Sequence, residues 1–152
     1  MPAPPFDADI ILVGGGMAGL TLALAAGQAG LSVIVLDAAP LAASLEAAFD
    51  GRVSALGRAS VRLMTALGVW PQMAKFAQPI LDILVSDGRI GGGPSPLSLH
   101  FDHLEGDNHT SGQALGHIIE NRHIRAALHA ALAGCRAAVT VRGQVMALAA
   151  IP

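Results

Sequence analysis

The sequence predicts an α/β fold with a parallel β-sheet, and three observations near its start carry this prediction. Residues 9–37, DIILVGGGMAGLTLALAAGQAGLSVIVLD, contain two short β-branched runs, a glycine cluster after the first run, and helix-forming residues between the two runs. A strand, a tight turn, a helix and a second strand within about thirty residues form one β-α-β unit. Strands that alternate with helices favour a parallel sheet.

The local sequence explains why each element of this unit is expected. The apolar runs at residues 9–13 and 31–37 are typical of buried parallel strands, so we expect both of their faces to be covered. Residues 17–29, MAGLTLALAAGQA, are mostly strong helix formers, and Gly30 is placed to end the helix.

Weaker signals follow in the middle of the chain. Residues 57–70, GRASVRLMTALGVW, have apolar residues at helical spacing and predict a helix that ends near Gly68. Residues 79–87, PILDILVSD, predict a strand. Residues 88–99 are rich in glycine and proline and predict a loop that a strand can follow.

The last part of the chain returns to regular patterns. Residues 114–134 predict a short extended piece that becomes a helix from about Glu120 and ends at Gly134. Residues 137–148, AAVTVRGQVMAL, alternate enough to predict one or two final strands.

The composition narrows the class of protein. The chain has 152 residues and a mass of 15.4 kDa, which fits one domain or part of one. A formal charge of −2 and a pI near 6.3 do not provide the basic patch that nucleic-acid binding needs. The single cysteine, Cys135, suits a reducing compartment, and the acidic, proline-rich start lacks the basic residues of a signal peptide. We therefore expect a cytoplasmic protein that does not bind nucleic acid.

Two interpretations compete for the uncharged run of residues 10–36. The run is long enough to cross a bilayer, for which about twenty apolar residues suffice. However, Gly14, Gly16 and Gly19 have G-x-G-x-x-G spacing between a predicted strand and a predicted helix. There the first glycine allows a tight turn, the second lets the backbone approach a pyrophosphate, and the third allows close helix-to-strand packing. Asp37 stands where an acid meets ribose hydroxyls, and its charge would repel a 2′-phosphate. We therefore favour a dinucleotide site for FAD or NAD over a membrane helix.

Four segments in this order resemble the N-terminal part of the FAD-dependent aromatic hydroxylases and, within them, the ubiquinone-biosynthesis hydroxylase group. They are ILVGGGMAGLTLALAAGQAGLSVIVLD, DGRVSALGRASVRLMTALGVW, ILDILVSD and LGHIIENRHIRAAL, and they span nearly all of residues 8–150. The resemblance implies a Rossmann-like FAD-binding domain of the aromatic-hydroxylase type, formed by residues 8–80 and 113–152 after a lead of residues 1–7. It also implies that residues 81–112 begin the sheet of a β-rich substrate domain. Family members are much longer, so we expect a piece of a longer enzyme or a truncated product.

The same resemblance assigns residues to the cofactor. It places Gly14, Gly16 and Gly19 at the FAD pyrophosphate and Asp37 at the adenosine ribose. Family members usually carry Glu at this ribose position, and Asp is one methylene shorter, so NAD binding remains the alternative.

Two arginines complete the implied site. Arg52, in DGRVSAL, matches the family arginine that reaches the phosphates of the flavin nucleotide, a task that suits a permanently charged, bidentate donor. The alternative for Arg52 is a solvated loop arginine. Arg122, in IIENRHIRAAL, matches a position near the flavin at the start of a helix, and the alternative is an ion pair with an acid three or four residues away. Arg125 is the less favoured candidate for the same role.

The resemblance implies aromatic hydroxylation by a flavin-dependent monooxygenase, with FAD as cofactor and NAD(P)H as electron donor. Because the cofactor carries the chemistry, no catalytic side chain is expected to stand out, and none is assigned. The implied substrate is an aromatic small molecule, a polyprenyl-phenol of ubiquinone biosynthesis, with peripheral association with the inner membrane or with a ubiquinone-biosynthesis complex. An NAD-binding dehydrogenase and a non-catalytic dinucleotide-binding module are the alternatives.

Other polar residues have ordinary interpretations. Residues 100–109, HFDHLEGDNH, are rich in metal-ligand types, but their spacing matches no established metal signature. We therefore predict a solvated hairpin or loop and no metal site. Cys135 is expected to be a small packed residue, and His117 and His123 are expected at a helix edge rather than in acid–base catalysis.

Overall fold

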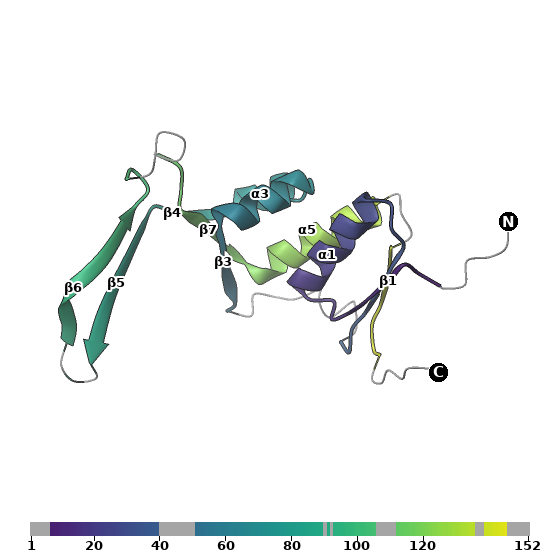
Figure 1. Cartoon of the computed structure of the whole chain (residues 1–152), viewed down its shortest axis with the longest axis horizontal. Helices are drawn as coiled ribbons and strands as arrows, with labels where there is room; N and C mark the ends of the chain where they lie inside the picture. Colours follow the sequence, from purple (N-terminus) through teal and green to yellow (C-terminus); the bar gives the residue numbers. More distant parts are fainter. Residues whose placement is uncertain are drawn as a thin grey trace.

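The structure is a computed structural model that describes residues 7–39, 51–89, 91, 93–105, 112–135 and 139–145. Its described strands form three small sheets. Its two longest helices, α1 (Met17–Gln28) and α5 (Asn121–Ala133), pack against each other and lie between the first two sheets (Figure 1).

The first sheet contains the predicted β-α-β unit. β1 (Ile10–Val13) and β2 (Val33–Leu36) pair in parallel, and β8 (Val139–Arg142) pairs in parallel with the other edge of β2. α1 connects β1 to β2, and the chain leaves the helix through Gly30, whose φ of +90° lies in the region that favours glycine. These elements confirm the predicted unit. β8 confirms a strand near the C-terminus, whereas residues 146–148 lie outside the described residues.

The second sheet is antiparallel. β3 (Val53–Gly57) and β4 (Gln78–Ile80) lie on either side of β7 (Gly116–Glu120). β3 continues directly into α3 (Arg58–Ala66), and β7 continues directly into α5. Because β3 and β7 run in opposite directions, the two helices leave opposite ends of this strand pair. α3 and α5 confirm the two helices that the sequence predicts in this region.

The chain between α3 and β4 contains two short turns of helix. Gly68 has a φ of +73° and ends the α3 region as predicted. α4 (Trp70–Met73) and the 3₁₀ turn η1 (Ala74–Phe76) follow and lead to β4. Met73 is fully buried, so this connection contributes to the core.

The third sheet is a hairpin of β5 (Asp82–Arg89) and β6 (Gly93–Asp102). It shares no strand with the other two sheets, and it extends away from the helices (Figure 1). The hairpin falls within residues 81–112, where the sequence predicts the first part of a substrate-domain sheet. That domain boundary stays a prediction.

The hairpin corrects two predictions. Residues 79–87 do not form one strand, since β4 ends at Ile80 and β5 begins at Asp82, and the two strands pair with different partners. Residues 88–99 are not a loop throughout, since β6 begins at Gly93. The prolines that suggested a loop are compatible with this strand because each strand of an isolated pair has a free edge, where a missing N–H costs no ladder hydrogen bond.

β3 is a strand that local sequence did not predict. Its residues form a ladder with β7 from the pair Val53–Glu120 to the pair Gly57–Gly116. The partners are distant in sequence, so the pairing depends on tertiary contacts that a local pattern does not reveal.

One hydrophobic core joins the first two sheets. α1 has no charged residue, and one of its faces, with Leu20, Ala23 and Leu24, is buried in this core. Its other apolar face is only partly covered, since Leu22 is 53% exposed. The largest fully buried side chains come from α1, β2, the α3–α4 connection, α4, β7 and α5: Leu20, Leu24, Val33, Val35, Val69, Met73, Ile119, Ile124 and Leu128.

The sequence predicts that both faces of the first sheet are covered, but the structure leaves one face of β1 exposed. Ile11 and Val13 on β1 are 61% and 72% exposed, whereas Val33 and Val35 on β2 are fully buried. Within the described residues, the helices cover only one face of β1. Since strands of a parallel sheet are normally buried on both sides, the face with Ile11 and Val13 is an unpartnered apolar surface in this chain.

Candidate functional site

The glycine-rich turn lies where β1 ends and α1 begins. Gly14 has a φ of +108°, and its N–H donates to the carbonyl of Leu36 (2.7 Å), which ties the turn to the end of β2. A Cβ on Gly19 would lie 1.9 Å from the carbonyl oxygen of Gly14, so only glycine fits there. A Cβ on Gly16 would meet no atom within 4 Å, so the protein itself does not require glycine at that position. Each of the three positions therefore favours glycine for a different reason: a positive φ at Gly14, a close backbone contact at Gly19, and open space for a ligand at Gly16.

The start of α1 has the features of an anion site. Gly16 is the N-cap residue, no side chain caps the helix, and the first turn contains no acid. The first N–H groups of a helix have no partner inside the helix, and the helix dipole favours negative charge at this end. This end of α1 can therefore receive phosphate oxygens.

Asp37 has a structural contact that the sequence did not reveal. It follows β2, and its carboxylate accepts hydrogen bonds from the N–H of Gly15 (2.5 Å) and the N–H of Ala39 (2.7 Å). The carboxylate thus holds the glycine turn in place from the end of the neighbouring strand. Each carboxylate oxygen can accept more than one hydrogen bond, so Asp37 keeps acceptor capacity for ribose hydroxyls.

Arg52 and Arg122 lie at one end of the β3–β7 pair. Arg52 immediately precedes β3, is exposed, and accepts a hydrogen bond at its carbonyl from the N–H of Asn121 (3.1 Å). Arg122 follows Asn121 at the start of α5, where the sequence places it. The Ser54 hydroxyl donates to the Asn121 side chain (2.6 Å) and joins the same two elements. The structure therefore brings the two predicted arginines to the same end of the β3–β7 strand pair.

Arg122 also forms an ion pair that differs from the predicted alternative. Its Nε donates to Glu120 at 2.6 Å, two residues away rather than three or four. His123 lies 3.6 Å from the same carboxylate and stacks on Phe76 with ring centroids 3.8 Å apart. Arg122 can still donate to a ligand, because a guanidinium has five N–H donors. Arg125, the less favoured candidate, has its Nε buried in α5.

An apolar groove is lined by residues of α1, β3, α3 and α5. Its volume is about 610 Å³, within the range of small-molecule pockets. Its polar side chains are the hydroxyls of Thr21, Ser54 and Ser60, so it offers no charged partner for phosphate. The lining residues are Met17, Ala18, Thr21, Leu22, Ala25, Ser54, Leu56, Ser60, Leu63, Met64 and Ile124.

The histidine-rich segment does not assemble a metal centre in the part of the chain that the structure describes. No group of three or more His, Cys, Asp or Glu side chains gathers there. His100 pairs with Asp82 across the hairpin at 3.0 Å, and His103 lies 3.0 Å from Asp102. His100 to Asp102 belong to β6, so this part of the segment is the predicted hairpin, whereas residues 106–111 lie outside the described residues.

Three further sequence interpretations can be compared with the structure. His117 is on the strand β7, not at a helix edge, whereas His123 is on α5. Cys135 is partly buried against the core, as expected of a small packed residue. Among the described residues, no helix has the length and apolar character needed to span a membrane. Residues 10–36 form β1, α1 and β2 rather than one long helix.

Sequence comparisons place the glycine turn in a known family. Residues 9–65 match the family model described as FAD binding domain. The chain is 41% identical over 121 residues to a ubiquinone hydroxylase, UbiL, of Rhodospirillum rubrum, which covers 80% of this chain and 26% of that protein. It is 33% identical over 122 residues to a second one, UbiM, of Neisseria meningitidis, covering 80% of this chain and 25% of that protein. The chain thus spans about a quarter of the length of these relatives.

Structural comparisons agree on the fold. The p-nitrophenol 4-monooxygenase PnpA of Pseudomonas putida superposes with a TM-score of 0.63 at 20% identity, over 89% of this chain and 30% of that chain. Aklavinone-11 hydroxylase, in a complex with FAD and aklavinone, gives a TM-score of 0.62 at 17% identity, over 93% of this chain and 26% of that chain. At these identities the superpositions show a shared fold. The sequence matches show that residues 9–65 carry an FAD binding domain and that the chain is similar to about a quarter of the length of two ubiquinone hydroxylases.

Proposed function

We propose that the chain is the FAD-binding part of a flavin-dependent monooxygenase that hydroxylates the aromatic ring of a polyprenyl-phenol in ubiquinone biosynthesis. The observation that carries the proposal is the glycine turn, where Gly16 leaves open space at the uncapped start of α1. The similarity to two ubiquinone hydroxylases supports the substrate class and favours this function over an NAD-binding dehydrogenase.

The residues of the site fit FAD. The N–H groups at the start of α1 would hold the pyrophosphate, and Gly14 and Gly19 would shape the turn that presents them. Asp37 would accept hydrogen bonds from the adenosine ribose. Arg52, with its exposed side chain, would place positive charge beside the phosphates.

FAD, reduced by NAD(P)H as electron donor, would activate O₂ and supply the oxygen that is transferred to an electron-rich ring. The described residues bind and orient the cofactor, and none of them is assigned a proton transfer. Arg122, at the start of α5, would orient the nucleotide from the second sheet. A polyprenyl substrate is strongly apolar, so the proposal includes peripheral contact of the enzyme with the inner membrane or with a ubiquinone-biosynthesis complex.

Flavin binding by the purified chain tests the proposal. We expect FAD to comigrate with the chain in gel filtration and its fluorescence to change with saturation, whereas NAD should not compete at equal concentration. Gly14→Val should abolish binding, because a side chain is strained at a φ of +108°. Arg52→Gln should weaken FAD binding about tenfold by removing a charge-assisted contact.

Arg62→Gln is the matched control for Arg52→Gln, because it removes another exposed arginine, on α3, without touching the glycine turn or the β3–β7 end that holds Arg52. It should leave FAD binding unchanged. A folded, colourless chain that binds NAD in preference to FAD would overturn the proposal. Equal losses in the Arg52 and Arg62 variants would remove the proposed role of Arg52.

The acid after β2 offers a separate test of the ribose contact. Asp37→Asn keeps one oxygen acceptor, which can serve the N–H of Gly15, but it loses the acceptor for the N–H of Ala39 and the negative charge. The fold should be retained with a small loss of stability, while FAD affinity falls severalfold. Thermal melting and FAD titration of the same sample separate the two effects. An affinity loss with only a small drop in melting temperature supports a ligand contact, whereas unchanged affinity contradicts it.

A further inference from the structure

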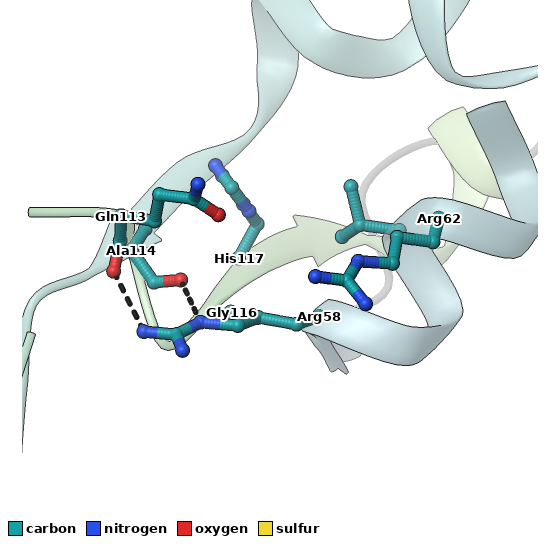
Figure 2. A pocket seen from close by; sticks show the side chains of 7 residues that line it. Arg58, Arg62, Gln113, Ala114, Gly116 and His117 are labelled. Atoms are coloured by element: carbon teal, nitrogen blue, oxygen red, sulfur yellow. Dashed lines mark hydrogen bonds between the residues drawn. The ribbon is translucent and has the colours of Figure 1, made fainter. Parts of the chain in front are cut away.

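A small pocket with arginine and histidine side chains lies at the end of the β3–β7 pair opposite Arg52 and Arg122. Its volume is about 140 Å³, and it is formed by the start of α3, the start of β7 and the turn before β7 (Figure 2). The lining residues are Arg58, Val61, Arg62, Gln113, Ala114, Gly116 and His117. This set contains two arginines and a histidine but no acid.

The two arginines have different local roles. Arg58 donates from Nε to the carbonyl of Ala114 (3.0 Å) and from Nη2 to the carbonyl of Gln113 (2.9 Å), so it fixes the turn before β7 (Figure 2). These bonds use two of its five N–H donors. Arg62 follows one helical turn later, so its side chain is on the same side of α3. Among the described residues, no carboxylate pairs with either arginine.

The histidine adds a buried polar atom. Nδ1 of His117 is buried, and it has no hydrogen-bond partner among the described residues. The edge of the His117 ring meets Trp70, with centroids 5.0 Å apart and planes at 67°. Because Nδ1 is closed to solvent, His117 faces the pocket with the rest of its ring. The charge at the pocket therefore comes from the two guanidinium groups, and within the described ranges no acid lines the pocket to balance it. A ligand of this pocket is therefore expected to carry negative charge.

Size and position separate this pocket from the proposed flavin site. At about 140 Å³ the pocket is well below the range of sites for cofactor-sized ligands, but it holds several times the roughly 30 Å³ of one water. β3 lies between Arg52 and Arg58, which places them on the order of 20 Å apart along the chain at about 3.4 Å per residue. An ion in this pocket would therefore not contact the cofactor phosphates.

We propose that this pocket binds a small oxyanion, a phosphate or carboxylate group, between the guanidinium groups of Arg58 and Arg62 and the ring of His117. Guanidinium groups bind such groups through paired, charge-assisted hydrogen bonds. Arg58 is already oriented by two main-chain carbonyls, which reduces the entropy lost on binding. The site is independent of the proposed function, because it shares no residue with the glycine turn or with Arg52.

Trp70 provides a local probe, since it is the only tryptophan in the chain and contacts His117. The purified chain is titrated with inorganic phosphate and, separately, with sodium acetate, while sodium chloride keeps the ionic strength constant. We expect a saturable change in Trp70 fluorescence with at least one of the two ions. A response to phosphate alone assigns a phosphate ligand, and a response to acetate alone assigns a carboxylate.

Variants identify the residues that respond. Arg62→Gln should raise the apparent Kd about tenfold or more, because it removes one charged donor without breaking a described contact. Arg62→Lys should recover part of the affinity. His117→Phe keeps an aromatic ring against Trp70 but removes both ring nitrogens, and it should also weaken binding. Arg52→Gln, the control, should leave the Trp70 response unchanged.

These outcomes also distinguish failure of this site from failure of the flavin proposal. Loss of FAD binding in Arg52→Gln with an intact Trp70 response affects only the flavin site. The anion proposal is overturned by the absence of a saturable response to either ion, by an equal response in Arg62→Gln, or by an equal effect of Arg52→Gln.

Discussion

The β1-α1-β2 unit and the β5–β6 hairpin both contain apolar strands. β2 of the first unit and the hairpin place their apolar residues in opposite environments, whereas β1 has one exposed face. Val33 and Val35 of β2 are fully buried, whereas Leu97 and Leu99 of β6 are 82% and 64% exposed. β2 belongs to the hydrophobic core that residues of α1 and α5 also form, whereas the hairpin is a separate two-stranded sheet. A two-stranded sheet alone is at best marginally stable in water. The comparison teaches that a strand-forming sequence does not by itself reveal how deeply a strand is buried.

The largest expected effect tests the close contact in the first unit. Gly19→Val should prevent native folding or FAD binding, because its Cβ would overlap the carbonyl of Gly14 and the backbone would have to move. Gly16→Ala should fold normally, since its Cβ meets no atom, yet it should lose FAD affinity if the pyrophosphate occupies that space. Circular dichroism and FAD titration measure the two properties separately.

Equal behaviour of the two glycine variants would contradict this distinction. If Gly16→Ala binds FAD as tightly as the unchanged chain, the pyrophosphate does not approach Gly16. If Gly19→Val melts at an unchanged temperature, the close contact between α1 and the glycine turn does not limit stability.

A second prediction compares burial directly in the two regions. Leu24→Ala removes a side chain from the α1 core and should lower the free energy of unfolding by about 2–5 kcal/mol. Leu97→Ala, on the exposed hairpin, should change it by no more than about 0.5 kcal/mol. Urea unfolding of both variants provides the measurement. Similar losses would show that the hairpin has a packed environment in solution.

The smallest expected effect concerns pH. Burial, and then the charge of Arg125, lowers the pKa of His129 on α5 below its ordinary value of 6.5. The unfolded chain therefore binds the proton more readily than the folded chain, so stability should fall as the pH drops through 6.5 toward the lower folded pKa. His129→Gln should reduce this dependence between neutral and mildly acidic pH. Melting temperatures across that range test it, and an unchanged slope would contradict the assignment to His129.

Asp9 makes the stability depend on pH in a separate, more acidic range. Hydrogen bonds from the side chain and backbone of Ser32 lower the pKa of Asp9 from 3.8. Its contribution to stability is present above this value and is lost at lower pH. The His129 experiment at milder pH is therefore free of the Asp9 titration.

The sequence predicted some parts of the site and missed others. The spacing of Gly14, Gly16 and Gly19 located the turn, because Gly14 adopts a positive φ and Gly19 allows a close approach, while Gly16 leaves open space at the start of α1. The ion pair of Arg122 with Glu120 was not predicted, since a residue on a strand and one at the start of a helix do not follow helical spacing. The hydrogen bond from Gly15 to Asp37 depends on two neighbouring strands, although an acid directly after a buried strand is a signal that could have suggested it.

The sequence by itself determined the β-α-β unit, its glycine turn and the two later helices α3 and α5, because hydrophobic spacing and glycine placement act over a few residues. Only the tertiary structure decided that β3 is a strand, that one face of β1 is exposed, and that Arg58, Arg62 and His117 share a pocket. Each of these depends on contacts between segments distant in the chain. Their formation reflects pairing and burial across the whole fold, which no local pattern contains.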